Sequence, residues 1–150
     1  MRNCLLLLIT CMMLVLGSCM QSADLPGPIA PLAINLVELE WGPPGDGSIA
    51  PAGTRTAPQG VDPVTGGVTY YAWFPANGHF DLHWHTYDEY VVVVQGPVTI
   101  ALGDDVHNLE TGGYIVIPGG MPHYWDVPAT GDAIILVRRA GPADFNFVNR

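Results

Sequence analysis

The sequence predicts an all-β domain, a barrel or a sandwich of short strands. Three observations support this. Short apolar or alternating segments recur at close intervals, turn-forming residues separate them, and sustained 3.6-residue periodicity is missing after the leader. The candidate strands are 35–41, 68–74, 91–95, 98–102, 114–117, 123–127, 133–139 and 145–148. The turn signals are Gln95-Gly96-Pro97, Gly103-Asp104-Asp105, Pro118-Gly119-Gly120 and Thr130-Gly131-Asp132.

The first part of this region is less regular. Residues 35–41 form a short strand candidate, and residues 42–67, dense in Gly, Pro, Thr and Ala, are expected to be a long irregular segment. A loop of that length is either functional or wraps an edge of the sheet. In the strand expected at 68–74, Tyr71 and Trp73 share one face, so they are available to line a pocket, as are Tyr90, Tyr124 and Trp125. Aromatic residues in a small barrel are more often part of the core.

The chemistry of the chain is concentrated between Gly78 and His123. His83 and His85 are two residues apart, so on a strand their imidazoles point to the same face. Glu89 is four residues further on and would be out of reach on a straight strand of about 3.3 Å per residue, unless residues 86–88 turn the chain. The apolar run at 90–94 begins a new strand, which makes that turn plausible. His123 lies just beyond a Pro/Gly turn that follows the strand at 114–117.

These residues resemble the two sequence motifs of the cupin superfamily. Gly78, His83, His85, Glu89 and Gly96 follow the first motif, although four residues rather than five separate Gly78 from His83. The second motif is matched by residues at the positions of its glycines, proline and histidine, namely Gly112, Pro118, Gly120 and His123, while Val127 replaces its asparagine. The motifs span about a third of the chain.

The resemblance implies a double-stranded β-helix, the cupin or jelly-roll barrel, in which a divalent metal is bound by His83, His85, Glu89 and His123. Three imidazoles and one carboxylate suit a transition metal such as Mn, Fe, Ni, Cu or Zn, and the sequence does not choose among them. Each imidazole should donate its other ring N–H to a neighbouring acceptor, for which the carboxylates of Asp81 and Asp88 are candidates.

The sequence gives less reason to place the other two histidines at the metal site. His79 could share the face of His83 and support a metal ligand, or it could be an ordinary surface histidine. His107 follows two aspartates in a polar hairpin, and we assign it no role.

Residues 1–18 are expected to be a secretory signal peptide, with a charged start, a short apolar core and small residues at the cleavage point. Leu16-Gly17-Ser18-Cys19 resembles the bacterial lipoprotein box, which implies cleavage before Cys19 and lipidation of this residue, with an outer-membrane location favoured in a Gram-negative cell. The alternative is an ordinary signal peptide cut later, for instance after Ala23. We expect residues 19–34 to contain the lipidated Cys19 and a tether, and residues 35–150 to form the cupin domain.

Composition excludes several functions. All three cysteines lie in or at the end of the leader, so disulfides and thiolate sites are excluded from the domain, and the chain has no lysine for Schiff-base chemistry. The net charge is −9, and about −10 without Arg2, which argues against nucleic-acid binding. Membrane contact is expected through the lipid anchor alone.

Three functions remain open on the sequence. The chain could be an exported metal-dependent enzyme acting on a small molecule, with the dioxygenases, isomerases and decarboxylases among cupins as precedents. It could instead be a non-catalytic envelope lipoprotein that binds a small ligand or a metal. In a third interpretation the ion only stabilises the fold, and function resides in contacts with partner proteins. The resemblance also implies a homodimer.

Overall fold

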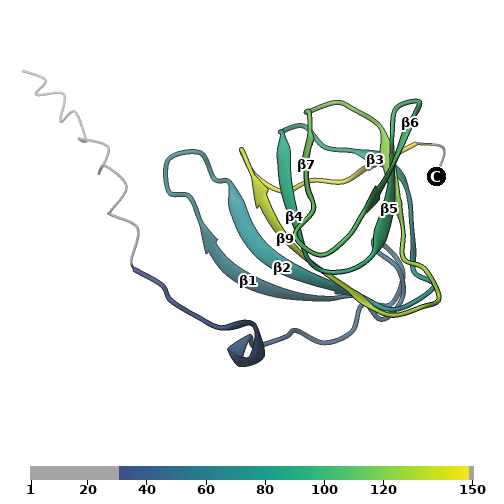
Figure 1. Ribbon diagram of the computed structural model, residues 1–150. Helices are drawn as coiled ribbons and strands as arrows, with labels where there is room; N and C mark the ends of the chain where they lie inside the picture. Colours follow the sequence, from purple (N-terminus) through teal and green to yellow (C-terminus); the bar gives the residue numbers. More distant parts are fainter. Residues whose placement is uncertain (1–30, 149–150) are drawn as a thin grey trace, which may run out of the picture.

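The computed structural model describes residues 31–148, which form two antiparallel sheets of five strands packed face to face (Figure 1). The first sheet has the order β1-β2-β9-β4-β7 and the second has the order β10-β3-β8-β5-β6. In chain order the elements are the 3-10 helix η1 (Leu36–Glu38), β1 (Arg55–Val61), β2 (Val68–Phe74), β3 (His79–Trp84), β4 (Glu89–Gln95), β5 (Val98–Leu102), β6 (Asp105–Leu109), β7 (Tyr114–Ile117), β8 (His123–Asp126), β9 (Ala133–Arg139) and β10 (Asn146–Phe147). The predicted all-β jelly-roll fold is confirmed.

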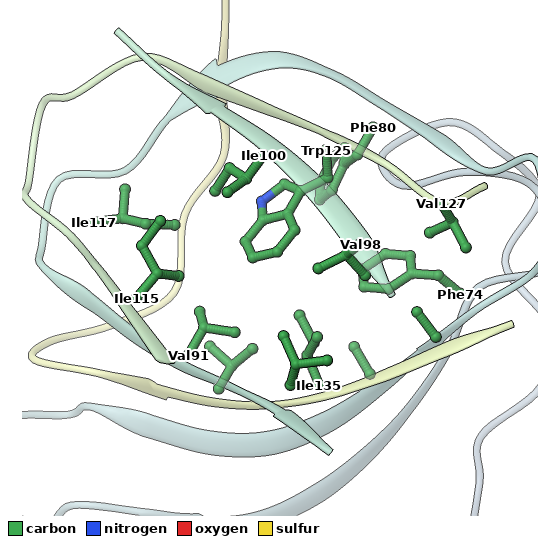
Figure 2. Close-up of a cluster of buried hydrophobic side chains, with 14 residues drawn as sticks. Phe74, Phe80, Val91, Val98, Ile100, Ile115, Ile117, Trp125, Val127 and Ile135 are labelled. Atoms are coloured by element: carbon green, nitrogen blue, oxygen red, sulfur yellow. The ribbon is translucent and has the colours of Figure 1, made fainter. Parts of the chain in front are cut away.

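The core fills the space between the sheets. Figure 2 shows the Trp125 indole of the second sheet pointing between the layers toward Val91 and Ile135 of the first. Because side chains alternate along each strand, the residues that face inward recur every second position, as Val91 and Val93 do on β4. Burying a side chain of this size contributes roughly 1.5–3 kcal/mol to stability. The two sheets are therefore held together mainly by apolar contacts.

Most predicted strands are present. The bounds of β2, β5, β7 and β9 agree with the sequence prediction, β4 begins earlier, at Glu89, and β8 ends one residue sooner, at Asp126. The last predicted strand, 145–148, is reduced to the two residues of β10. The apolar alternation that predicted these strands is the pattern that the two-sheet core requires.

Two local predictions are wrong, and one further strand was missed. Residues 35–41 contain η1 rather than a strand, because the Glu38 carboxylate accepts hydrogen bonds from both the main-chain and the side-chain nitrogen of Asn35, at 2.7 and 2.8 Å. The segment expected to be irregular contains β1. The polar hairpin around His107 is present, but its second strand, β6, was not among the predicted strands. Both missed strands are edge strands with mostly exposed side chains, so they lack a buried face that would produce alternation.

The predicted signal peptide, Cys19 and most of the predicted tether lie outside the described residues. Their assignment, and the boundary of the cupin domain at residue 35, stay predictions. Within residues 31–148, no helix has the length and apolar character needed to cross a membrane.

Candidate metal centre and adjoining cavity

The four predicted ligands come from both sheets. His83 lies on β3, His85 directly follows β3, and His123 begins β8, which is paired with β3 in the second sheet. Glu89 begins β4 in the first sheet. The predicted turn at residues 86–88 is therefore present, and it carries the chain from one sheet to the other, so that Glu89 faces the histidines across the barrel.

The three histidines place one ring nitrogen each in the same small region. One nitrogen from each of His83, His85 and His123 lies within 4.8 Å of the others, close enough to share an ion. Oε2 of Glu89 lies 3.0 Å from Nε2 of His85 and 3.9 Å from Nε2 of His123. All four side chains are buried. The four residues at the ligand positions of the sequence motifs therefore lie close together in the structure.

Main-chain carbonyls fix the orientation of all three imidazoles. Nδ1 of His83 donates to the carbonyl of Asp81 at 2.6 Å, Nδ1 of His85 to that of Asp144 at 2.6 Å, and Nδ1 of His123 to that of Met121 at 3.0 Å. A carbonyl can only accept, so each Nδ1 must carry the proton. In the neutral ring the Nε2 lone pair is then free, which is the form that binds a metal.

The electrostatics of the site favour neutral His83 and His123 and an ionised Glu89. Burial, together with the neighbouring His123 ring, lowers the pKa of His83 to about 3, and burial also lowers the pKa of His123. Burial alone would raise the pKa of Glu89, but the neighbouring His85 and the charge of Arg139 outweigh it and hold the pKa below its ordinary value. The group therefore offers lone pairs and one negative charge at neutral pH.

Unpartnered atoms indicate that the site fits a cation. Among the described residues, Nε2 of His123 and Oε2 of Glu89 are buried without a hydrogen-bond partner. Leaving such atoms unsatisfied costs on the order of 1–3 kcal/mol each. A divalent ion bound by three imidazoles and a carboxylate would satisfy both atoms.

A small cavity of about 50 Å³ adjoins this group between the sheets. Three of the predicted ligands reach it, and Arg139 and Tyr70 line its wall. The remaining lining residues are mostly apolar and are Ala50, Thr54, Thr56, Ala72, Phe74, Phe80, Trp125, Ile135 and Phe145. Two wider hollows share Thr56 and Phe145 with the cavity, so these residues lie where the three spaces meet.

Several sequence expectations around the site need correction. Asp81 does support His83, but through its main-chain carbonyl rather than its carboxylate, and the Asp88 carboxylate accepts instead from the Gly119 N–H. His79 is half-exposed and pairs with Asp126 at 2.7 Å, so it is a surface histidine. His107 is exposed on β6.

Most of the aromatic residues that were available to line a pocket do not line this cavity. Of the five candidates only Trp125 reaches the cavity, and Tyr71 and Trp73 line separate surface hollows. The inward face of β2 carries Tyr70, Ala72 and Phe74, which is the opposite parity.

Two residues that the sequence reading did not single out are central to the site. Arg139 lies opposite Glu89 in the pairing of β9 with β4, is 1% exposed, and places Nη2 3.6 Å from Oε1 of Glu89. Asp144, in the segment after β9, supplies the carbonyl that holds His85. A signal for Arg139 did exist, since it continues the inward-facing row of Ile135 and Val137. No comparable periodic signal marks Asp144.

Comparisons with known proteins agree with this geometry. Residues 71–137 match the family model described as Cupin domain. The uncharacterized protein y4oW of Sinorhizobium fredii (strain NBRC 101917 / NGR234) is 33% identical over 73 residues, which cover 49% of this chain and 32% of that protein. This chain therefore aligns with about a third of its curated relative.

Two solved structures show the same fold. A cupin-like protein from Thermotoga maritima superposes with a TM-score of 0.63 at 17% identity, over 74% of this chain and 89% of that chain. The polyketide cyclase RemF from Streptomyces resistomycificus superposes with a TM-score of 0.63 at 17% identity, over 81% of this chain and 87% of that chain. With the matched motifs, the two-sheet barrel and the clustered histidines, the family match identifies residues 71–137 as a cupin domain, and the solved structures share the fold of this chain.

Proposed function

We propose that this chain is an exported, metal-dependent enzyme that acts on a small molecule held beside His83, His85, Glu89 and His123. The observation that carries the proposal is the set of three imidazoles, each fixed by a carbonyl at Nδ1, with their other nitrogens converging next to a cavity. A purely structural ion would need no such adjoining space. The cavity gives a ligand access to the metal ligands.

Each part of the site would have a distinct role. His83, His85, Glu89 and His123 would hold the ion, and a divalent ion there would polarise an oxygen atom of the substrate. The apolar wall of the cavity would exclude water and strengthen the electrostatic interactions inside it. Tyr70 would stay a neutral hydrogen-bond donor, because burial, with the charge of Glu89, raises its pKa to about 12.

The reaction type is open between oxygenase-like and isomerase-like chemistry. The barrel is similar to that of a polyketide cyclase, which supports catalysis on this fold. At 17% identity, the shared fold does not indicate which substrate this chain would use.

Turnover separates an enzyme from the alternative, a non-catalytic lipoprotein that binds a ligand or metal. The full chain, loaded with Mn, Fe, Ni, Cu or Zn in turn, would be incubated with a panel of small molecules and followed by NMR. We expect consumption of at least one compound by loaded protein, and none after chelation or by a His123→Ala variant. Compounds that bind reversibly without being consumed, for every metal, would contradict catalysis and favour the binding module.

Export and lipidation of Cys19 are part of the same proposal. Mass spectrometry of the N-terminal peptide from membrane and soluble fractions would test them. We expect an acylated Cys19 in the membrane fraction. An uncleaved leader would contradict export, and an unmodified terminus near Ala23 would contradict lipidation alone.

A further inference from the structure

Arg139 is a buried cation whose hydrogen-bonding capacity is largely unused. Its Nη2 lies 3.6 Å from Oε1 of Glu89 and donates a long hydrogen bond to the Tyr70 hydroxyl at 3.4 Å. Among residues 31–148, its Nε and Nη1 have no hydrogen-bond partner, although the side chain is 1% exposed and lines the cavity. A buried guanidinium left in this state is costly unless a ligand accepts from it.

The charge balance of the cavity depends on the metal. Without an ion, Glu89 and Arg139 neutralise each other, and Glu89 is the one buried carboxylate among the described residues. A divalent ion bound by neutral imidazoles adds two positive charges. The Asp144 carboxylate is partly buried and accepts hydrogen bonds from Thr86 and Asn146. It does not line the cavity, and its single negative charge offsets only part of the charge of a divalent ion. A metal-loaded cavity therefore favours an anion.

The surroundings of the cavity indicate the shape of that anion. A space of about 50 Å³ holds only a few atoms, so a larger ligand must continue into an adjoining hollow. One hollow contains the Asp46 carboxylate. The other, of about 310 Å³, shares Thr56, Tyr70 and Phe145 with the cavity and has no charged side chain. The remaining lining residues of that apolar groove are Pro58, Gly60, Val61, Val68, Thr69 and Ala143.

We infer that the cavity binds a small monocarboxylic acid as its anion, with the carboxylate accepting hydrogen bonds from Arg139 and an apolar tail extending into the groove beside Tyr70 and Phe145. This inference rests on the proposed function, because the bound ion supplies the excess positive charge. It assigns Arg139 to ligand recognition, a role distinct from holding the ion.

Calorimetry on the Zn²⁺-loaded full chain tests the inference with four probes: acetate, butyrate, butyramide and 1-butanol. We expect butyrate to bind about tenfold or more tighter than butyramide and 1-butanol, since a charge-assisted hydrogen bond is worth roughly 1.5–3 kcal/mol. We expect acetate to bind about tenfold more weakly than butyrate, because two methylene groups fewer are buried.

Variants assign the effect to Arg139. Arg139→Gln should weaken butyrate binding about ten- to a hundredfold. It should bind Zn²⁺ at least as tightly as the parent, because it removes a positive charge beside Glu89. Arg139→Lys keeps that charge and is the second variant if the Gln form does not fold. Arg138→Gln is the matched control, since Arg138 is its chain neighbour, is largely exposed and lies 3.9 Å from Asp62, away from the cavity.

The outcomes separate this inference from the proposed function. Protein that takes up Zn²⁺ but binds butyrate and butyramide equally, or binds butyrate equally in the Arg139 variants, overturns the inference alone. If the protein takes up no metal, the proposed function is contradicted. The inference is then tested on metal-free protein, where equal butyrate binding by the parent and by Arg139→Gln would overturn it.

Discussion

The carbonyl of Asp144 accepts the Nδ1 proton of His85 at 2.6 Å, which ties the C-terminal segment to the metal centre. The carboxylate of the same residue accepts hydrogen bonds from the main-chain nitrogen and the hydroxyl of Thr86, at 3.0 and 2.6 Å. Phe145, the next residue, packs edge-on against the His85 ring at 5.1 Å. The segment after β9 thus positions His85 although it lies 59 residues further along the chain.

Replacing Asp144 by alanine should weaken metal binding. The variant keeps the carbonyl but loses the carboxylate that anchors it to Thr86 and Asn146, and loss of such supporting contacts typically costs about 10–100-fold in metal affinity. Competition titration with a chromogenic chelator measures the change. Asp132→Ala is the matched control, because its carboxylate bonds the Ala76 N–H away from the site. Equal losses in both variants would contradict a specific role for Asp144.

Metal should stabilise the folded protein. Binding to the native state alone adds about 2.7 kcal/mol when the free metal is a hundred times its Kd, which for a domain of this size raises the Tm by roughly 10 °C. Differential scanning calorimetry with added Zn²⁺ or with EDTA checks this. The His83→Ala variant should show no shift, and a shift of the same size in that variant would place the ion elsewhere.

The chelator-treated protein should lose stability as the pH falls from 6.5. Burial lowers the pKa of His83 to about 3, so between pH 6.5 and 3 this residue is protonated in the unfolded chain but not in the native protein. The unfolded state then binds more protons, and the free energy of unfolding falls by up to about 1.4 kcal/mol per pH unit for each such histidine. Urea unfolding at pH 7, 6 and 5 measures the slope. His83→Gln should flatten it, and an unchanged slope would rule out His83 as the titrating group.

Filling the cavity should separate ligand binding from metal binding. Ala72 is buried on β2, lines the cavity and is not one of the predicted ligands, so Ala72→Leu places three further carbon atoms in that space. Overpacking costs about 1–3 kcal/mol, which a Tm measurement quantifies. We expect parental metal content but loss of butyrate binding. Undiminished butyrate binding would show that the ligand occupies another space.

The central strands were predicted from apolar alternation, and the ligand set from the resemblance to the cupin motifs. One physical reason connects the two predictions. Inward-facing positions repeat every second residue, so Val91 and Glu89 share a face, as do Trp125 and His123. The apolar pattern that builds the core therefore also directs the ligands, and the turn after His85 brings Glu89 in from the opposite sheet.

The remaining features depend on information that local patterns lack. The edge strands β1 and β6 are mostly exposed, so no buried face marks them. The carbonyls that orient the imidazoles belong to the main chain. Every residue has such a carbonyl, so the residue type does not show which one accepts the hydrogen bond. The partnership of Glu89 with Arg139 arises from the pairing of β4 with β9, which only the folded chain brings together.

The metal content of the purified protein is the most direct measurement of whether His83, His85, Glu89 and His123 share an ion. Elemental analysis of the parent, a His83→Ala/His85→Ala double variant and the exposed-histidine control His107→Ala would be compared after identical dialysis. We expect about one transition-metal ion per chain in the parent and the control, and almost none in the double variant. Equal metal content in all three proteins, or none in the parent after metal supplementation, would contradict the site.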